Sequence, residues 1–188
     1  MLPNVKESEW SVTGWVYDLN TSILYTMRFD PKKGVNIMKM LVCIDGSEQS
    51  LHALGKAYEI ASQCGVNEVA LLHVYENIKR SYWLSTDEGY SPSEKELERI
   101  ENVEDQVIAK KKEMLLKAAH KFESNGIVVE KKLLQGHVSH TIIREADDGN
   151  YDMIVIGSRG LGGLKKIFLG SVSNAVLQEA HCSVLVVK

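Results

Sequence analysis

The stretch YDMIVIGSRGLGGLKKIFLGSVSNAV, residues 151–176, decides the fold of this protein. It contains an apolar run, Met153 to Ile156, and leads into a segment of helical character, Val172 to Leu177. Between them, residues 157–171 hold five glycines and three cations but no acidic side chain. Because glycine weakens strands and helices, such a cluster indicates either a flexible connection or backbone that something bulky approaches closely. The second alternative is an anion site, where amide N–H groups and a helix start face phosphates.

Similar apolar runs recur along the chain, and each of the first four precedes a helical pattern. The five runs are 40–44, 69–74, 127–134, 153–156 and 184–187. Short apolar strands that alternate with helices predict an α/β fold, a doubly wound five-stranded parallel sheet with helices on both faces. The charges of Glu130, Lys131 and Lys132 predict that the third of these strands is an edge strand.

The expected helices begin at polar or glycine residues. Ser47 or Ser50 is expected to cap the first helix, which Gly65 ends. The second helix is expected over 100–122, because the preceding stretch 77–98 is polar and contains Gly89 and Pro92.

Composition indicates a globular protein with a full hydrophobic core. The 188 residues are 44% hydrophobic and 25% charged, which suits one domain with an appendage. A formal net charge of −3 argues against a general nucleic-acid binder. The three cysteines lack metal-site spacing, no run approaches the ~18 apolar residues of a membrane span, and the first residues lack a signal-peptide core. We therefore expect a cytoplasmic protein with no nucleic-acid or membrane partner.

Residues 1–37 do not follow the strand–helix alternation. Aromatic and β-branched residues over 10–17 and 23–29 predict a β-hairpin, followed by a turn or linker. The expected organisation is an N-terminal extension over 1–37 and a nucleotide-binding domain over 38–188. At the other end, residues 183–188 form an apolar strand that we expect at a sheet edge, where it would pair with a second copy in a homodimer.

Several catalytic signatures are absent from the sequence. There is no GxxxxGK[ST] P-loop, no GxGxxG after a strand and no GxSxG nucleophile motif. His137 and His140 could form a metal pair, but no third ligand accompanies them. His73, in an apolar strand, is expected to be a satisfied core histidine. Asp45 ends the first strand and is either a turn or cap acid or an acceptor for ribose and adenine groups.

The glycine stretch has the pattern G-x2-G-x9-G-S. Gly157 and Gly160 follow a strand directly, and Gly170 and Ser171 open the last helix. This spacing predicts two amide-rich corners around one pocket, with phosphates on backbone N–H groups and at the positive end of the helix. Arg159, Lys165 and Lys166 add positive charge that no nearby acid cancels.

Residues 38–188 resemble the ATP-binding subgroup of the universal stress protein family. The resemblance rests on MLVCIDGSEQS at 40–50, EVALLHV at 68–74, residues 151–176 and the tail CSVLVVK. It implies a flavodoxin-like sheet of the adenine-nucleotide α-hydrolase type with strand order 3-2-1-4-5, a homodimer, and ATP held with Mg2+ or Mn2+. Arg159 stands where family members often have His, and Cys43 where Pro is common.

The resemblance also implies roles for individual residues. Asp45 and Val74 would hold adenine and ribose, and Gly157, Gly160, Gly170, Ser171 and Ser173 the phosphates. The full set of candidate nucleotide-contacting residues also includes Cys43, Ile44, Ser47, Ile156, Ser158, Arg159 and Val172. Members mostly act as nucleotide-responsive regulators with an unidentified protein partner. The alternatives are a slow or partner-dependent ATPase, a variant that binds AMP or cyclic AMP, and a dimerisation module without nucleotide.

Overall fold

The structure, a computed structural model, describes the backbone of residues 12–18, 23–29, 38–64, 66, 68–76, 93–162 and 169–188. Side chains are described from residue 38 onward within these ranges, Cys64 excepted. The strands are β1 (Val12–Asp18), β2 (Ile23–Phe29), β3 (Lys39–Cys43), β4 (Glu68–Tyr75), β5 (Val128–Gln135), β6 (Met153–Gly157) and β7 (Ser183–Val187). The helices are α1 (Glu48–Cys64), α3 (Glu94–Glu123), α4 (Val138–Asp148) and α5 (Ser171–Glu179).

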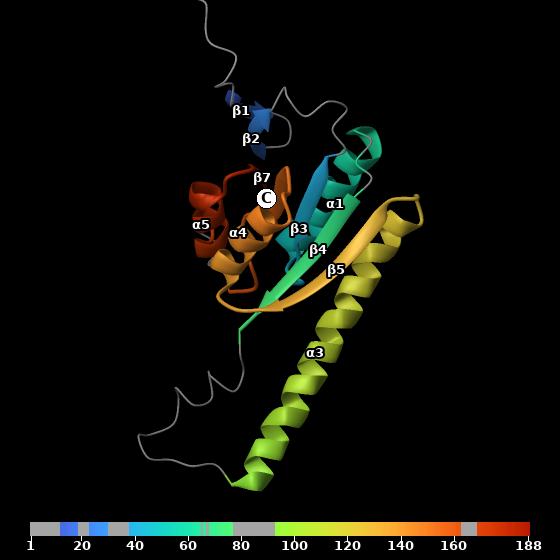
Figure 1. Cartoon of the computed structure of the whole chain (residues 1–188), viewed down its shortest axis with the longest axis vertical. Helices are drawn as coiled ribbons and strands as arrows, with labels where there is room; N and C mark the ends of the chain where they lie inside the picture. The colour runs from blue at the N-terminus through green and yellow to red at the C-terminus, as the bar shows by residue number, and fades with distance from the viewer. Residues whose placement is uncertain are drawn as a thin grey trace, which may run out of the picture.

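All described strands belong to one sheet, in the order β1-β2-β7-β6-β3-β4-β5. Its parallel part consists of β5, β4, β3, β6 and β7 (Figure 1). In chain order of these five strands this is the arrangement 3-2-1-4-5, so the predicted doubly wound α/β fold is confirmed. β5 lies at one end of the sheet, as its charged residues predicted.

Two helices cover each face of the parallel sheet, because successive side chains of a strand point to opposite faces. On β3, Met40 and Val42 join the core cluster that includes residues of α1 and α3. Leu41 and Cys43 join the opposite cluster, which includes residues of α4 and α5. The sheet is therefore buried on both sides, as its nearly continuous apolar strands require.

The N-terminal hairpin is part of the same sheet. β1 and β2 pair antiparallel, and β2 pairs antiparallel with β7 through Leu24–Val186, Tyr25–Leu185 and Thr26–Val184. The expectation that 183–188 forms a free sheet edge is therefore wrong, because a strand of the same chain occupies that edge. Dimerisation through this strand, which no observation tests, would require β2 to leave it.

Helix boundaries follow local capping. The Ser47 hydroxyl accepts a hydrogen bond from the Ser50 N–H at 3.2 Å, which confirms Ser47 as the cap of α1. α3 begins at Glu94, six residues before the expected start, because Ser93 and Glu96 form a capping box. It ends before Gly126, whose φ of +77° suits a glycine after a helix. Among the described residues, no helix is long and apolar enough to cross a membrane.

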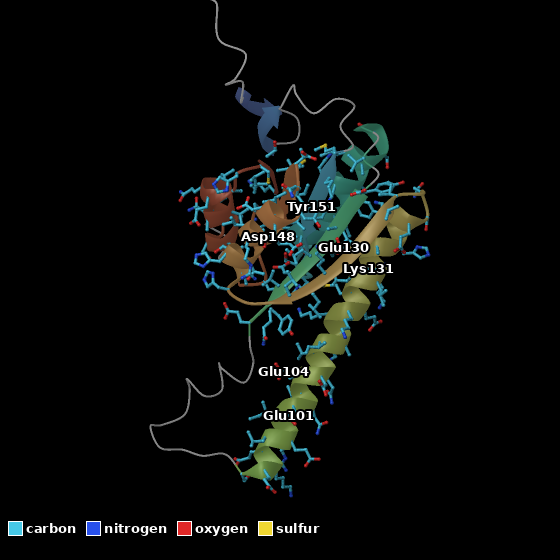
Figure 2. All side chains as sticks on the ribbon, in the orientation of Figure 1. Glu101, Glu104, Glu130, Lys131, Asp148 and Tyr151 are labelled. Carbon is cyan, nitrogen blue, oxygen red and sulfur yellow. The ribbon has the colours of Figure 1, made fainter. Side chains whose placement is uncertain are left out.

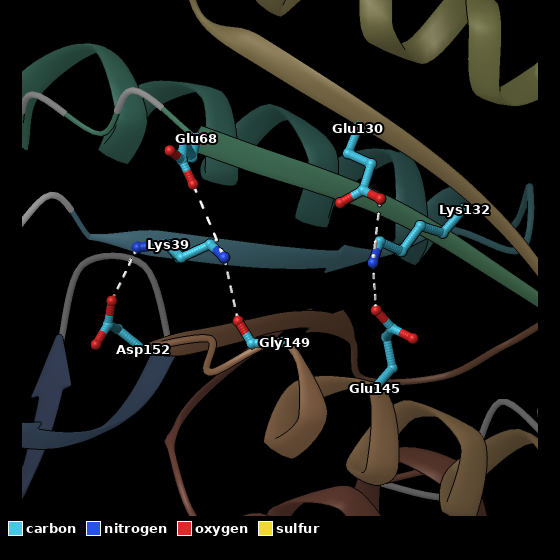
Figure 3. A network of polar contacts seen from close by, with 7 residues as sticks. All are labelled: Lys39, Glu68, Glu130, Lys132, Glu145, Gly149 and Asp152. Carbon is cyan, nitrogen blue, oxygen red and sulfur yellow. Dashed lines mark hydrogen bonds and ion pairs between the residues drawn. The ribbon is translucent and has the colours of Figure 1, made fainter.

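Polar contacts join strands β3 and β5 to α4 and to the residues that follow α4 (Figure 3). Lys132 on β5 donates to Glu145 on α4 at 2.5 Å and lies 3.2 Å from Glu130. Burial lowers the pKa of Lys132, but the two carboxylates outweigh it and hold the pKa above its ordinary value. Lys39 donates its backbone N–H to Asp152 and its ammonium to Gly149 O. These contacts fix α4, whose first turns line the cavity described below.

Candidate functional site

A cavity of about 570 Å3 opens at the carboxyl ends of β3, β4 and β6. This is the position where parallel α/β sheets hold ligands. The start of α5 forms one side of it, and residues of α4 form another. Most of the residues that the sequence singled out line the cavity: Cys43, Ile44, Asp45, Val74, Ile156, Gly157, Arg159, Gly160, Gly170, Ser171, Val172 and Ser173.

Two expected residues, Ser47 and Ser158, do not line the cavity. Ser47 caps α1, and its hydroxyl lies 3.4 Å from Arg159 O. Ser158 ties together the loop after β6: its N–H donates to Val187 O at 2.6 Å, and its carbonyl accepts the Gly170 N–H at 2.8 Å. Both serines therefore hold the walls of the cavity in place and do not face into it.

Asp45 is both a turn acid and a residue of the cavity. Its Oδ1 accepts the Ser47 N–H at 2.8 Å, which fixes the turn between β3 and α1. A Cβ at Gly160 would lie 2.6 Å from Asp45 Oδ2. Gly160 thus leaves room for this carboxylate, an acceptor suited to hydroxyl or amino groups. Of the described residues that line the cavity, Asp45 and Arg159 are the charged ones.

The last helix begins at the cavity with a glycine as its N-cap. Gly170 is the N-cap of α5, with φ −73° and ψ 161°, and it makes no side-chain cap hydrogen bond. The first-turn N–H groups of a helix lack intrahelical acceptors, and the helix dipole makes this end positive. With Arg159 lining the same cavity, this end suits an anionic group.

The Ser173 hydroxyl is already engaged within the fold. It is buried and lies 2.8 Å from Ser158 O and 3.0 Å from Gly170 O, either of which can accept its one hydrogen. Ser171, by contrast, is exposed at the first position of α5. Ser171 is therefore the better placed of the two hydroxyls to contact a ligand.

The opposite wall of the cavity is apolar. Val74 and Ile156, which the sequence singled out, lie there with residues that it missed: Leu72, Val138 and Ile142. Ser50, Leu161, Gly162 and Leu169 were missed as well. The helical period placed Ile142 on the sheet-facing side of its helix, but this period does not distinguish a cavity wall from a filled core. The cavity therefore combines an apolar part with an anion-attracting end.

Two titratable groups near the cavity are held neutral by burial. Burial raises the pKa of the Cys43 thiol, with smaller contributions from Cys182 and Asp45. Burial also lowers the pKa of His73, although a hydrogen bond to Ile44 O partly opposes this effect. His73 Nδ1 lies 2.6 Å from Ile44 O, so the neutral ring donates there and links β4 to the loop that carries Asp45. His73 is a satisfied core histidine, as expected.

The histidine pair at the start of α4 belongs to no metal-binding group of described side chains. The rings of His137 and His140 lie 4.8 Å apart. Within the part of the chain that the structure describes, no group of three or more His, Cys, Asp and Glu residues could hold a metal ion. The pair lacks the further ligands that a structural metal site needs.

A doubly wound sheet with a mixed apolar and anion-attracting cavity at its carboxyl edge defines an α/β protein with a candidate ligand site at the usual place for this architecture. The profile of the Universal stress protein family matches residues 36–188, and the chain belongs to this family.

Individual relatives cover most of the same region. Universal stress protein YxiE of Bacillus subtilis is 34% identical over 150 residues, which are 80% of this chain and 98% of that protein. The solved structure of MJ0577, a protein of Methanocaldococcus jannaschii, superposes with a TM-score of 0.66 at 26% identity and covers 82% of this chain and 97% of that one. A universal stress protein in complex with cAMP matches with a TM-score of 0.54 at 22% identity, over 80% of this chain and 97% of that one.

Proposed function

We propose that the cavity binds an adenine nucleotide, with ATP the expected ligand, and that the protein is a nucleotide-dependent regulator in a stress response. The observation that carries the proposal is the amino end of α5, where Gly170 provides no side-chain cap and Arg159 lines the same cavity. Phosphates are the groups that such an end favours. The solved complex of a similar fold with cAMP supports an adenine nucleotide in this family.

The apolar part of the cavity suits a purine ring. Leu72, Val74 and Ile142 offer aliphatic surface on which a flat base can pack. Asp45 then supplies the acceptor for ribose or amino hydrogens. The residues present thus fit both halves of a nucleotide, the base and the phosphates.

A divalent cation, Mg2+ or Mn2+, would accompany the phosphates of ATP and neutralise part of their charge. The protein offers few oxygen ligands for it: among the described lining residues these are the Asp45 carboxylate and serine hydroxyls, of which Ser171 is exposed. Phosphate oxygens and water molecules would therefore supply most of the cation's ligands. We expect regulation, not rapid turnover, because no acidic or histidine side chain other than Asp45 lines the described cavity as a general base.

Substitution at Gly170 tests the proposal. A Cβ at this position would lie 3.5 Å from Arg159 Cα and Ser158 O, an ordinary contact, and its backbone angles suit any residue. Gly170→Val should therefore fold normally, while its branched side chain covers the amino end of α5. Isothermal titration calorimetry with ATP and Mg2+ should show binding to the wild type and a loss of at least about 100-fold in Gly170→Val, equivalent to ~2.7 kcal/mol.

The control is Gly55→Ala on α1, where a Cβ meets nothing within 4 Å. This variant should bind ATP like the wild type. Wild-type affinity in Gly170→Val would show that the nucleotide does not use this helix end.

AMP or cyclic AMP is the second candidate ligand, favoured by the cAMP complex of the similar protein. Mass spectrometry of nucleotide that co-purifies with the protein, released by denaturation, distinguishes these ligands. If cyclic AMP competes more strongly than ATP in the calorimeter, the specificity assigned to ATP is wrong while the site remains.

A further inference from the structure

Helix α3 extends well beyond the sheet that it covers (Figure 1). Its buried residues, Leu115, Ala118, Ala119 and Phe122, all lie in its last third. A Cβ at Gly46, at the carboxyl edge of the sheet, would lie 3.3 Å from Met114 Sδ, so Met114 marks the level of that edge. Residues 94–113, which we call the α3 extension, therefore continue past the edge for about 30 Å.

The α3 extension carries an apolar stripe. Leu97, Ile100, Val103 and Val107 recur at three and four residues, the spacing that places side chains on one face of a helix. Leu97 is 38% exposed and Val103 is 52% exposed, whereas Ile100 and Val107 are half-buried. In the helical register this stripe continues the face that packs on the sheet from Met114 onward. The stripe therefore resembles a packing face, but none of the described helices and strands packs against it.

Charge is distributed unevenly along the α3 extension. Its first part is acidic, and Figure 2 shows Glu101 and Glu104 on the part that projects beyond the sheet. The acids over 94–105 are Glu94, Glu96, Glu98, Glu101, Glu104 and Asp105, against Lys95 and Arg99. The following turn is basic, with Lys110, Lys111 and Lys112 in a row before Glu113, which pairs with Lys117 at 2.7 Å.

This asymmetry distinguishes between two ways of pairing such helices. Two parallel copies would place acidic against acidic and basic against basic residues, which is unfavourable. Two antiparallel copies would place the acidic part of each against the three lysines of the other. The same arrangement brings the apolar stripes together as the seam of a two-stranded coiled coil.

We propose that the α3 extension is an interface with a second copy of this chain, in which the two extensions pack antiparallel. The centre of the overlap lies near Asp105, so Val103 faces Val107 of the partner subunit. Sheets of the two copies then lie at opposite ends of the helix pair. This interface is independent of nucleotide binding and needs no free sheet edge, which matters because β2 occupies the edge of β7.

The first test changes the stripe. Sedimentation velocity of the full chain over a range of concentrations should show a dimer that weakens by about ten-fold or more in Val103→Glu and Val107→Glu, because each buries a charge in the seam. Val128→Glu is the matched control: this valine is 69% exposed on β5, away from the stripe. Circular dichroism should show unchanged helix content in all three variants.

The second test changes the charges. Replacing Lys110, Lys111 and Lys112 by Glu should give a monomer, because the helix becomes acidic throughout. A second variant also replaces Glu98, Glu101 and Glu104 by Lys, so that the charges of both halves of the extension are reversed. If the helices are antiparallel, this variant should form the dimer again. In a parallel pair each half faces its own kind in the wild type and in both variants, so the dimer would show neither the loss nor the recovery.

Three results would overturn the proposal. A wild-type chain that is monomeric at all concentrations assigns the stripe to another occupant, such as residues 77–92 of the same chain, which join Glu76 to Ser93. A dimer that persists in both valine variants uses another surface. A dimer that the double charge reversal does not restore contradicts the antiparallel arrangement.

Discussion

Gly157 on β6 lies directly against Gln49 on α1. A Cβ at position 157 would come within 2.8 Å of the Gln49 carbonyl carbon and 2.9 Å of the Ser50 nitrogen. Backbone atoms cannot move aside as the end of a flexible side chain can. The first glycine of the G-x2-G-x9-G-S pattern is thus explained by the packing of α1 on the sheet, whereas Gly160 leaves room for Asp45.

This contact predicts a loss of stability in Gly157→Ala. The added methyl group should push α1 away from β6 and lower the free energy of unfolding by about 1–3 kcal/mol. Urea denaturation followed by circular dichroism measures the change. Gly162→Ala is the control, because a Cβ there meets nothing within 4 Å and should change stability little. Equal stability of the two variants would refute the packing explanation.

Ser171→Ala tests the hydroxyl at the start of α5. Because this side chain is exposed, its removal should leave the fold intact and weaken ATP binding through the loss of one hydrogen bond to a charged phosphate, by ~1–3 kcal/mol. Calorimetry measures the affinity. Ser62→Ala, on an exposed part of α1, should bind like the wild type. An unchanged affinity in Ser171→Ala would remove this hydroxyl from the site.

The stability of the protein should depend on pH through His73. Burial holds the pKa of His73 below its ordinary value of 6.5, so below pH 6.5 the unfolded chain binds a proton that the native state excludes. The free energy of unfolding should therefore fall as pH falls from 6.5 toward the native pKa, by up to ~1.4 kcal/mol per pH unit, and His73 should add no pH dependence above that range.

Urea denaturation at several pH values measures this dependence. His73→Gln should show a shallower dependence between pH 6.5 and 5, whereas His140→Gln, at an exposed position, should behave like the wild type. If His73→Gln retains the full dependence, other groups cause it.

The division of the chain at residue 38 remains a prediction. The described residues of the candidate cavity all lie in 38–188, so a chain that begins at Met38 should fold and bind ATP with unchanged affinity. Without β2, the edge of β7 becomes free, and this shortened chain should associate more strongly than the full chain. Calorimetry and sedimentation measure both properties. Loss of ATP binding in a folded shortened chain would contradict the division.

The sequence predicted the parallel strands because each apolar run has to be buried on both faces, and it predicted the edge at β5 because Glu130, Lys131 and Lys132 interrupt that run with charges. It predicted most of the cavity because glycines and Asp45 mark the carboxyl ends of strands. The missed wall residues, such as Leu72 and Ile142, belong to the ordinary apolar periodicity of a core. In such a pattern, lining a cavity leaves no sign that differs from filling the core.

Two features were not predicted: the start of α3, which depends on a local capping contact, and the pairing of β2 with β7, which is a long-range contact. The start of α3 was placed too late because residues 94–99 are polar apart from Leu97, although Ser93 and Glu96 have the spacing of a capping box. The pairing of β2 with β7 could not be predicted from the sequence. Strands pair through backbone hydrogen bonds, which form with most combinations of side chains.

The pairing of β2 with β7 also constrains when the sheet can be completed during synthesis. The hairpin leaves the ribosome before the other described strands, but the strand that it joins, β7, is the last of them to be made. A two-stranded hairpin alone is marginally stable in water. Throughout translation the nascent chain therefore carries an unpaired, β-prone amino-terminal segment, which is a target for chaperones until the rest of the chain has emerged.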